Sequence, residues 1–346
     1  MTHIGIDCRF SLGHSGIGRY TREIVPLLIS LGSDFSFTLF VRSGKEEWLK
    51  DLPGTFSVVE ADIPHYSVAE QFRFPLQIRS SGIDLLFAPH FNVPLRCGVP
   101  FIVTIHDLIL HRYPNQASFL KRRAYRFLMK RSVRKSGKVI AVSAFTAQEL
   151  VSVYGESIRK KITVIHEGIS SQFSPRSEEE QERVRNAYGI RGAFFLYVGN
   201  AKEHKNVQLL IDAFRKASPD AQLLLVSSGK EAGRLSLSPG VRILDSVLDA
   251  DLPALYSAAR ATVTASLYEG FCFPILEAAA CGCPVIATNG SAIAEVAPSG
   301  ALLLEPTEEA FAKAFSSLPL DCDSAGICSW EETAQKTLSL LREFCP

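Results

Sequence analysis

Residues 261–288, ATVTASLYEGFCFPILEAAACGCPVIAT, predict the fold of the chain better than any other stretch. The apolar run Ala261–Ser266 is typical of a buried strand, and Tyr268–Phe273 is typical of the loop that leaves its carboxyl end. Pro274 suits the first position of a helix, because its φ is fixed and its missing N–H would be unpaired there anyway. Gly282 then ends this short helix, and the Pro-Val-Ile-Ala-Thr run begins the next strand. The stretch therefore predicts one strand–helix–strand unit of a parallel sheet.

Two carboxylates, Glu269 and Glu277, stand on either side of this strand-to-helix junction. The junction suits an anion, because free N–H groups and the positive dipole end at Ile275 and Leu276 attract phosphate. Glu269, in the loop, is placed to grip sugar hydroxyls, and Glu277, expected in the first helical turn, to accept bonds from a ribose diol. A first-turn carboxylate is also favourable for structural reasons alone. The pair, rather than Glu277 by itself, therefore indicates a ligand site.

Strand-like apolar runs alternate with helical patterns along the whole chain, which indicates parallel sheets with crossover helices. Continuous hydrophobicity within each run suits strands buried on both faces. The predicted strands are Ile4–Cys8, Ser36–Val41, Ser57–Ala61, Leu85–Ala88, Phe101–Ile105, Val139–Val142, Thr163–Ile165, Phe194–Val198, Leu223–Val226, Arg242–Leu244, Thr262–Ala265, Val285–Thr288 and Leu302–Leu304.

The polar stretch 169–189, with the acidic run Glu178–Glu180, predicts a linker carrying a surface helix. It separates a domain at 1–168 from a second domain at 190–325. A chain of 346 residues fits two domains that each bury a core. A capping box at Ser329–Glu332 predicts a final helix within 329–346.

The composition, with 47% apolar and 21% charged residues, indicates a soluble globular protein. A formal net charge of +1 gives no global attraction to nucleic acid or to an acidic membrane. The eight cysteines form no Cys-x-x-Cys motif, which predicts reduced thiols in a cytoplasmic protein and no zinc site. The sequence shows neither a signal-peptide pattern nor a run of apolar residues long enough to span a bilayer.

The segment Glu269–Glu277 resembles the E-x7-E signature of the retaining glycosyltransferases of family GT4, and the resemblance covers nearly the whole chain. It implies an α/β protein of the GT-B fold, with two Rossmann-like domains whose parallel sheets face each other across a central cleft. It also implies that the first domain is the acceptor side, that the second binds the nucleotide-sugar donor, and that the final helix packs back on the first domain. In this resemblance Glu269 faces the donor sugar and Glu277 holds the ribose. Further contacts to sugar and diphosphate fall to Gly270, Phe271, Cys272, Phe273, Ile275 and Leu276.

A glycine-rich loop, Gly13-His-Ser-Gly16-Ile-Gly18-Arg-Tyr, follows the first predicted strand. Glycines allow a phosphate or a sugar to approach the backbone at a helix N-terminus. The spacing is not the G-x-G-x-x-G of a dinucleotide fold, which argues against an NAD-linked oxidoreductase. A plain tight turn would account for the glycines equally well. The loop resembles that of mannosyltransferase-like GT4 members, which implies that Gly16 and Gly18 close over the donor diphosphate and the acceptor. Pro26, farther along the same helix, predicts a kink or an early end.

The run Thr-Ile-His106-Asp107-Leu stands at the end of the fifth predicted strand. In isolation such a histidine is more often a structural hydrogen-bonding group than a catalytic one. The run resembles the GT4 segment whose histidine lies close to the transferred sugar, which implies that His106 bonds a sugar hydroxyl and orients the acceptor. It is not expected to be a general base, because the leaving phosphate is thought to take that part in the family. Asp107 either orients the imidazole or caps the following loop.

The segment Gly199–Asn206, after the eighth predicted strand, resembles the family's glycine-loop-lysine element. It implies that Gly199 and Lys205 contact the donor diphosphate, although Lys205 alone would be read as a surface lysine. Asn200 stands where many relatives carry an arginine, so one expected positive charge is missing there. Either the phosphate field is weaker, or Lys202 or Arg19 completes it. Farther on, Ser246 and Val247 match the segment that lays backbone groups against the nucleobase.

The stretch 121–138 holds nine basic residues and no acidic one. Leu120, Ala124, Phe127 and Leu128 give it an apolar stripe, so it predicts an amphipathic helix. One interpretation is a core-facing helix with a solvated basic face. The other is peripheral contact with an anionic membrane or a lipid-diphosphate acceptor, at roughly 1 kcal/mol per basic residue. Nucleic-acid binding is not expected, because no such module is recognisable.

These features together predict a retaining glycosyltransferase that moves a hexose from a nucleotide-diphosphate sugar, with GDP-mannose favoured, to a hydroxyl of a glycan or glycolipid. Positioning and stabilisation of the departing diphosphate would supply the catalysis. No Asp-x-Asp metal site is evident, so no metal and no cofactor are expected. Two alternatives stay open, a nucleotide-sugar epimerase on the same fold and a non-catalytic nucleotide-sugar-binding protein. The residues leave the donor, acceptor, linkage and oligomeric state open.

Overall fold

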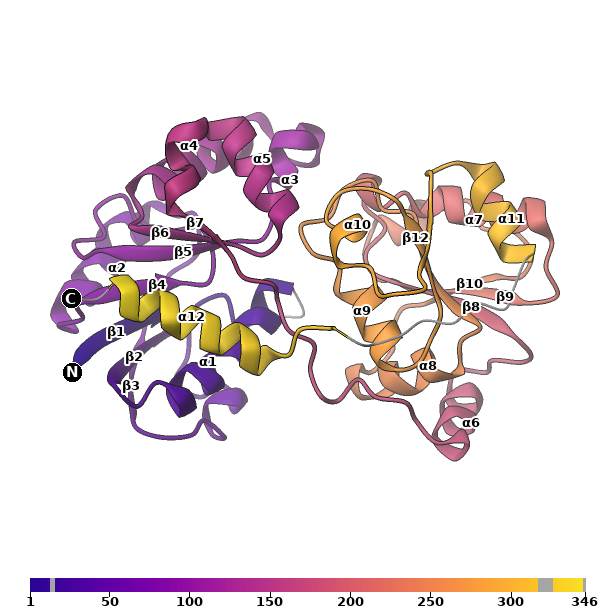
Figure 1. The fold of residues 1–346 in the computed structure, drawn as a ribbon, viewed down its shortest axis with the longest axis horizontal. Helices are drawn as coiled ribbons and strands as arrows, with labels where there is room; N and C mark the ends of the chain where they lie inside the picture. Colours follow the sequence, from indigo (N-terminus) through magenta and orange to yellow (C-terminus); the bar gives the residue numbers. More distant parts are fainter. Residues whose placement is uncertain (13–15, 317–325, 345–346) are drawn as a thin grey trace. The chain divides into compact units, whose positions relative to one another are not determined.

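The computed structural model describes residues 1–12, 16–316 and 326–344 (Figure 1). The chain divides into two compact units, one made of Met1–Gly168 with Cys328–Pro346 and the other of Ile169–Ile327. Each unit is built around one parallel sheet.

The sheet of the first unit has seven strands in the order β3-β2-β1-β4-β5-β6-β7, and every neighbouring pair is parallel. From β1 the chain adds strands outward to β3, then returns to add β4 to β7 on the other side of β1. The loops after β1 and β4 therefore diverge at the topological switch point of the sheet, where ligands of such sheets bind. The strands are β1 (Thr2–Asp7), β2 (Phe35–Val41), β3 (Phe56–Glu60), β4 (Leu85–Ala88), β5 (Phe101–Ile105), β6 (Lys138–Ala141) and β7 (Ile162–Val164).

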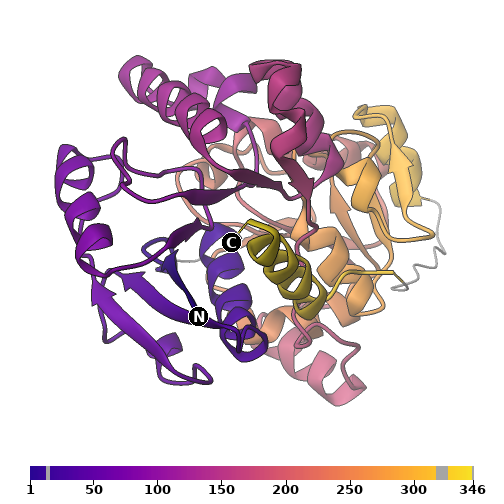
Figure 2. The same ribbon diagram turned by 60° about the vertical axis from the view of Figure 1, so that its left-hand side comes forward.

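Helices cover both faces of this sheet. On one face, α2, α4 and α5 bury apolar side chains in a shared core that includes Phe74, Met129 and Leu150. On the other face, α1 packs against α12, as Figures 1 and 2 show. The helices of this unit are α1 (Gly16–Leu31), α2 (Val68–Ser80), α3 (Ile109–Arg112), α4 (Phe119–Lys135), α5 (Ala144–Tyr154) and α12 (Trp330–Phe344).

The C-terminal helix α12 belongs to the first unit although 159 residues of the second unit, 169–327, precede it. The Trp330 ring packs edge-on against Tyr20, with centroids 5.6 Å apart. The Thr333 hydroxyl donates to the His166 carbonyl oxygen at 2.8 Å. Gly168 has to be a glycine, because a Cβ there would lie 2.1 Å from the Trp330 backbone nitrogen.

The sheet of the second unit has six parallel strands in the order β10-β9-β8-β11-β12-β13. Its switch point lies between β8 and β11. The strands are β8 (Phe194–Val198), β9 (Gln222–Val226), β10 (Val241–Leu244), β11 (Ala261–Thr264), β12 (Val285–Thr288) and β13 (Leu302–Leu304). The helices are α6 (Glu178–Ala187), α7 (Val207–Ala217), α8 (Leu252–Ala258), α9 (Phe273–Ala280), α10 (Ile293–Val296) and α11 (Glu308–Ser316).

The stretch predicted as a linker carries α6, and this helix is attached to the second unit. The Arg183 guanidinium donates to Asp251 at 2.6 Å, and the Tyr188 hydroxyl donates to the same carboxylate at 2.7 Å. A full capping box, in which Ser177 and Glu180 bond each other's backbone N–H, starts the helix.

Two helices differ from the sequence-based expectation. The early end predicted at Pro26 is wrong, since α1 continues to Leu31. The apolar stripe predicted for the basic helix is also wrong in most of its members. Leu128 is buried, but Leu120 and Phe127 are exposed to 77% and 58%, and Ala124 is exposed as well. The face that α4 buries instead consists of Tyr125, Leu128, Met129, Ser132 and Val133.

Candidate functional site

The loops at the switch point of the second sheet bring Lys205 and Glu269 together. Lys205 ends a 3₁₀ turn, Glu203–Lys205, that follows β8, and Glu269 lies in the loop that follows β11. The Lys205 ammonium lies 2.5 Å from the Glu269 Oε1 atom. Both side chains are largely shielded, at 17% and 12% exposure, so water screens their attraction only in part. Two residues 64 positions apart thus form one charged centre at the edge where parallel sheets bind ligands.

Backbone contacts fix the loop that carries Glu269. The Leu267 N–H donates to the His204 carbonyl oxygen at 2.7 Å, which ties this loop to the turn of Lys205. The Glu269 N–H donates to the Ser291 hydroxyl at 3.1 Å. The charged centre is therefore held by loops from β8, β11 and β12.

The loop that leaves β8 depends on a glycine. Gly199 has φ +150°, and a Cβ there would lie 3.0 Å from the Tyr197 hydroxyl oxygen. That hydroxyl donates to the Asn200 carbonyl oxygen at 2.6 Å. The Asn200 side-chain oxygen accepts from the Lys202 N–H at 3.2 Å. The residue that replaces the expected arginine thus braces the loop with its amide.

The helix after Glu269 begins one residue earlier than predicted, at Phe273, with Pro274 second. Cys272 precedes it with φ 91° and ψ 66°, a left-handed conformation that residues with a Cβ rarely adopt. Gly270, Phe271 and Cys272 are buried, and burial raises the pKa of the Cys272 thiol, followed by the charge of Glu269. The first-turn amides, which include Ile275, have no helical partner upstream and so form the positive end of α9.

Glu277 does not lie in the first turn of α9 as expected, because the helix starts at Phe273 and places it in the second turn. Its side chain is buried, with 2% of the residue exposed. The Tyr256 hydroxyl of α8 donates to the Glu277 Oε2 atom at 2.9 Å. The structure therefore gives Glu277 a partner inside the protein and leaves its ribose role a prediction.

Ser246 and Val247 follow β10, the outermost strand on that side, two strands from β8. Ser246 is exposed, and its hydroxyl donates to Asp245 at 3.2 Å. The proposed contacts to a nucleobase involve backbone groups here, so the positions are compatible with the prediction without testing it.

In the first unit, both ring nitrogens of His106 are already engaged. Nδ1 lies 2.8 Å from Glu167 Oε1, and Nε2 lies 2.8 Å from the Pro89 carbonyl oxygen. A carboxylate and a carbonyl only accept hydrogen bonds, so these two contacts favour the imidazolium form, which donates from both ring nitrogens. Burial lowers the pKa of His106, but the hydrogen bond and charge of Glu167 outweigh burial and raise it overall.

This arrangement differs from the role given to His106 by resemblance, because neither ring nitrogen is left to bond a sugar hydroxyl while these contacts hold. Glu167 was missed as a site residue, since it follows β7 in no recognised motif. Of the two roles considered for Asp107, the structure shows the cap, in which its carboxylate accepts from the Ile109 N–H at 2.8 Å.

The glycine loop is described only in part. Gly16 is the first residue of α1, and Gly18 is buried in its first turn. Gly13 lies outside the described residues.

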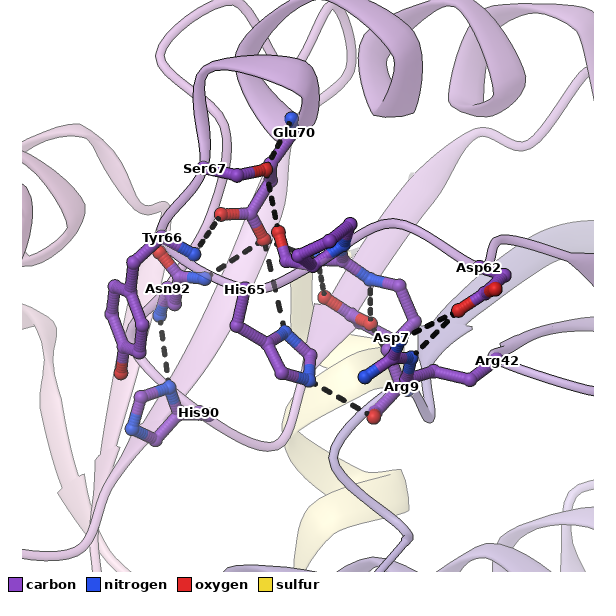
Figure 3. Close-up of polar contacts among 11 residues, drawn as sticks. Asp7, Arg9, Arg42, Asp62, His65, Tyr66, Ser67, Glu70, His90 and Asn92 are labelled. Atoms are coloured by element: carbon purple, nitrogen blue, oxygen red, sulfur yellow. Dashed lines mark hydrogen bonds and ion pairs between the residues drawn. The ribbon is translucent and has the colours of Figure 1, made fainter.

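A buried ionic cluster, also missed from the sequence, lies at the switch point of the first sheet (Figure 3). Arg9 donates to both oxygens of Asp7 at 2.8 Å and pairs with Glu70 at 2.9 Å. The three residues are between 0% and 3% exposed. The Arg9 guanidinium also lies 3.6 Å from the centre of the Phe74 ring. Burial raises the pKa of Glu70, but the bonds and charges of His65 and Arg9 lower it overall.

Among the described residues, no three histidine, cysteine or acidic side chains gather as a metal site. The same search range contains no helix that is both long and apolar enough to cross a membrane. The cysteines within that part of the chain are free thiols.

Two family models match the chain in succession. The model described as "Glycosyltransferase Family 4" matches residues 14–173, and the one described as "Glycosyl transferases group 1" matches residues 192–321. The chain belongs to the family 4 glycosyltransferases. The GT-B fold class predicted from the sequence is confirmed, with its two parallel α/β sheets of seven and six strands.

Relatives and solved structures agree with this assignment. The chain is 28% identical to O-antigen chain mannosyltransferase B of Escherichia coli over 324 residues, which cover 85% of this chain and 84% of the relative. It is 30% identical to O-antigen chain mannosyltransferase RfbU of Salmonella typhimurium over 67% of this chain and 64% of the relative. The fold is similar to that of Anabaena HepE, solved with UDP-glucose, with a TM-score of 0.74, 16% identity, and coverage of 99% and 100% of the two chains.

Proposed function

We propose that this glycosyltransferase moves a hexose, with retention of anomeric configuration, from a nucleotide-diphosphate sugar to a hydroxyl of a glycan or glycolipid. The observation that carries the proposal is the Lys205–Glu269 pair at the switch point of the second sheet. The names of two relatives, both O-antigen chain mannosyltransferases, favour mannose as the sugar and hence GDP-mannose as the donor. They also favour a growing polysaccharide as the acceptor.

In this proposal the second unit binds the donor and the first unit binds the acceptor. The pair is the resting state of the donor site, in which the Lys205 ammonium lies against the Glu269 carboxylate in a shielded place. The donor diphosphate then attracts the Lys205 ammonium, and Glu269 is released to accept hydrogen bonds from sugar hydroxyls. The amides at the start of α9 stabilise charge on the departing diphosphate. Gly199 lets the β8 loop approach the phosphates.

The remaining donor contacts in the proposal follow the family resemblance. Glu277 would exchange its bond from Tyr256, or share it, to reach the ribose. Backbone groups of Ser246 and Val247 would meet the base. Further backbone groups would contact the sugar and the phosphates, namely those of Gly16, Gly18, Asn200, Gly270, Phe271, Cys272, Phe273, Ile275 and Leu276.

We assign His106 a different role from the one implied by resemblance. An imidazolium fixed by Glu167 and Pro89 has no ring nitrogen to offer as a base or as a new donor. In this proposal it holds a positive charge, paired with Glu167, at the carboxyl edge of the first sheet as long as the pH stays below its raised pKa. Glu167 is the positioning residue that keeps this charge in place.

Charge stabilisation by Lys205 and the α9 amides requires no metal ion, and turnover is proposed to continue in the presence of a chelator. The lipid-linked form of the acceptor would bring the enzyme to the inner face of an anionic membrane, with the basic stretch 121–138 as the attracting element. No nucleic-acid partner and no cofactor belong to this proposal.

A thermal-shift screen of GDP, UDP, ADP and dTDP with their sugars tests the donor assignment, since a ligand that binds only the folded state raises the melting temperature. Lys205→Ala and Glu269→Ala are expected to lose most sugar transfer while staying folded. Wild-type turnover in both variants would refute the assigned site. Product analysis without an acceptor separates transfer from epimerisation, and a protein that only binds would show neither transfer nor slow donor hydrolysis.

A further inference from the structure

Helix α2 turns an apolar stripe toward solvent. Its inner side buries Phe74 and Ile78 in the core of the first unit. Val68, Phe72 and Leu76 are exposed to 76%, 67% and 64%. Their spacing of four residues places them one above another on a single helix face. Single exposed apolar residues are ordinary, but a continuous apolar stripe is typical of a surface that binds a protein or a membrane.

Helix α4 exposes apolar residues among positive charges. Phe119, Leu120 and Phe127 are 60%, 77% and 58% exposed. The guanidinium groups of Arg122 and Arg123 lie 5.5 and 5.8 Å from the centre of the Phe119 ring. Eight of the seventeen residues of α4 are basic and none is acidic. The only acidic residue of α2, Glu70, is fully buried in the ion pair with Arg9. The outer sides of both helices are thus apolar and positive.

The two helices lie on the same face of the sheet. Both bury their inner sides in one core, and right-handed crossovers place them together, away from α1 and α12 (Figures 1 and 2). The segment after β4 connects them directly. The Leu95 N–H donates to the Gln71 side chain of α2 at 2.8 Å, and the Arg131 guanidinium of α4 donates to the Leu95 carbonyl oxygen. The Leu95 segment therefore links α2 and α4 on this face of the first unit.

The inner side of α2 is anchored at its first turn, as Figure 3 shows. Glu70 accepts from the Tyr66 N–H and from the Asn92 amide, both at 2.8 Å, in addition to its ion pair with Arg9. The Ser67 hydroxyl caps the helix by accepting from the Glu70 N–H at 3.1 Å. Turning the stripe inward would break these buried contacts. The exposed stripe is therefore a fixed feature of the surface.

We propose that α2 and α4 form one docking surface for an anionic membrane. Val68, Phe72 and Leu76 enter the interfacial region together with the exposed apolar side chains of α4, and the basic side chains of α4 contact acidic head groups. A peripheral protein needs apolar burial and electrostatic attraction together for firm binding, and the surface supplies both. The apolar share comes mainly from α2, which carries no basic run.

A second copy of this chain fits the surface less well than a membrane. A two-fold interface would place each α4 against the same surface of its partner, so the eight basic residues would face like charges. A nucleic acid would match the charge but leave the apolar stripe of α2 uncovered. Membrane binding does not depend on turnover, although its purpose rests on the proposed lipid-linked acceptor.

Flotation of the full chain with phosphatidylcholine vesicles, with and without phosphatidylglycerol, tests the proposal. Wild type should float with the anionic vesicles, and the bound fraction should fall as salt is raised. Phe72→Ser/Leu76→Ser should reduce partitioning at least about tenfold. Lys121→Gln/Arg122→Gln/Arg123→Gln should reduce it about a hundredfold. Leu237→Ser is the matched control, since this leucine is 49% exposed in the second unit and should leave binding unchanged.

Thermal unfolding of each variant shows whether the fold is kept, and the thermal shift by GDP-mannose reports the donor site separately. Equal flotation of wild type and Phe72→Ser/Leu76→Ser would overturn the proposal. So would a wild-type dimer that does not float and that the same double variant turns into a monomer, because the stripe would then be a contact between copies.

Discussion

Replacing Glu167 with glutamine should lower the pKa of His106 without changing the shape of the side chain. In the wild type the imidazolium donates to a carboxylate and to a carbonyl, each at 2.8 Å, with Glu167 3% exposed. The amide oxygen of glutamine can accept the same bond but carries no charge. A hydrogen bond between charged groups contributes about 1.5–3 kcal/mol and a neutral one about 0.5–1.5 kcal/mol, so the change removes about 1 kcal/mol. Losing it should lower the pKa of His106 toward its ordinary value.

The sign of the pH effect follows from the direction of the shift. The folded-state pKa of His106 is raised, so its contribution to stability is fully present below the unfolded value of about 6.5. It is lost as the pH rises through the folded-state pKa. The stability gap between wild type and Glu167→Gln should therefore be largest near the acidic end of the neutral range and shrink toward alkaline pH.

Urea unfolding at several pH values measures this gap, and histidine NMR reads the pKa itself. Glu149→Gln is the matched control, because Glu149 accepts from the Arg112 guanidinium, which stays charged throughout. Its stability loss should not vary over the same pH range. In the pH–rate profile of Glu167→Gln, the acidic limb should match that of the wild type. The alkaline limb should move to lower pH, because His106 loses its proton at lower pH in this variant. A gap that is constant with pH, or an unchanged His106 pKa, would refute the imidazolium assignment.

Three further outcomes follow from the structure. Cys272→Gly should be more stable than Cys272→Ala by about 1 kcal/mol in thermal unfolding, since both remove the thiol but only glycine accepts φ 91° freely. The opposite order of stability would show that the backbone at residue 272 is not strained. Arg9→Met should destabilise the protein by about 3–5 kcal/mol in urea unfolding, because Asp7 and Glu70 stay buried without their cation. Arg42→Met, in an exposed pair, should cost less than about 1 kcal/mol. Similar losses in the two variants would contradict the burial argument. EDTA should leave initial transfer rates unchanged, and a rate restored only by added Mg²⁺ or Mn²⁺ would overturn the charge-stabilisation proposal.

The strands of both sheets could be predicted from the sequence alone. Each of the predicted apolar runs is a strand in the structure, with ends that differ by two residues at most. Continuous hydrophobicity identifies such strands because both of their faces are covered. Helix faces were harder. The basic helix α4 carries apolar residues on two sides, and the sequence cannot show which side meets the core. Tyr125, Met129 and Val133 face inward, and Phe127 faces solvent.

The sequence predicted which residues belong to the candidate site, but not which of them contact each other. Lys205 and Glu269 were identified by resemblance, yet their direct ion pair depends on which strands are neighbours, and sequence order does not disclose that β8 lies beside β11. Glu167 has no local signal, because it acts on a histidine 61 residues away. Glu70 had one, since Ser67-Val-Ala-Glu70 is a capping-box pattern. That pattern predicts the cap and not the buried charge.

The charged groups missed from the sequence gather for a topological reason. In each sheet the chain adds strands in opposite directions from a central pair, β1 and β4 in one and β8 and β11 in the other. The loops that leave such a pair turn away from each other and leave backbone groups that no neighbouring strand covers. Polar side chains fill this place, Arg9 with its two carboxylates in the first sheet and Lys205 with Glu269 in the second. The first pair of loops is closed by buried charges, while the second holds the Lys205 ammonium against the Glu269 carboxylate in the loop before α9. A diphosphate can compete for that ammonium, and so the second sheet, rather than the first, is the one expected to respond to a nucleotide sugar.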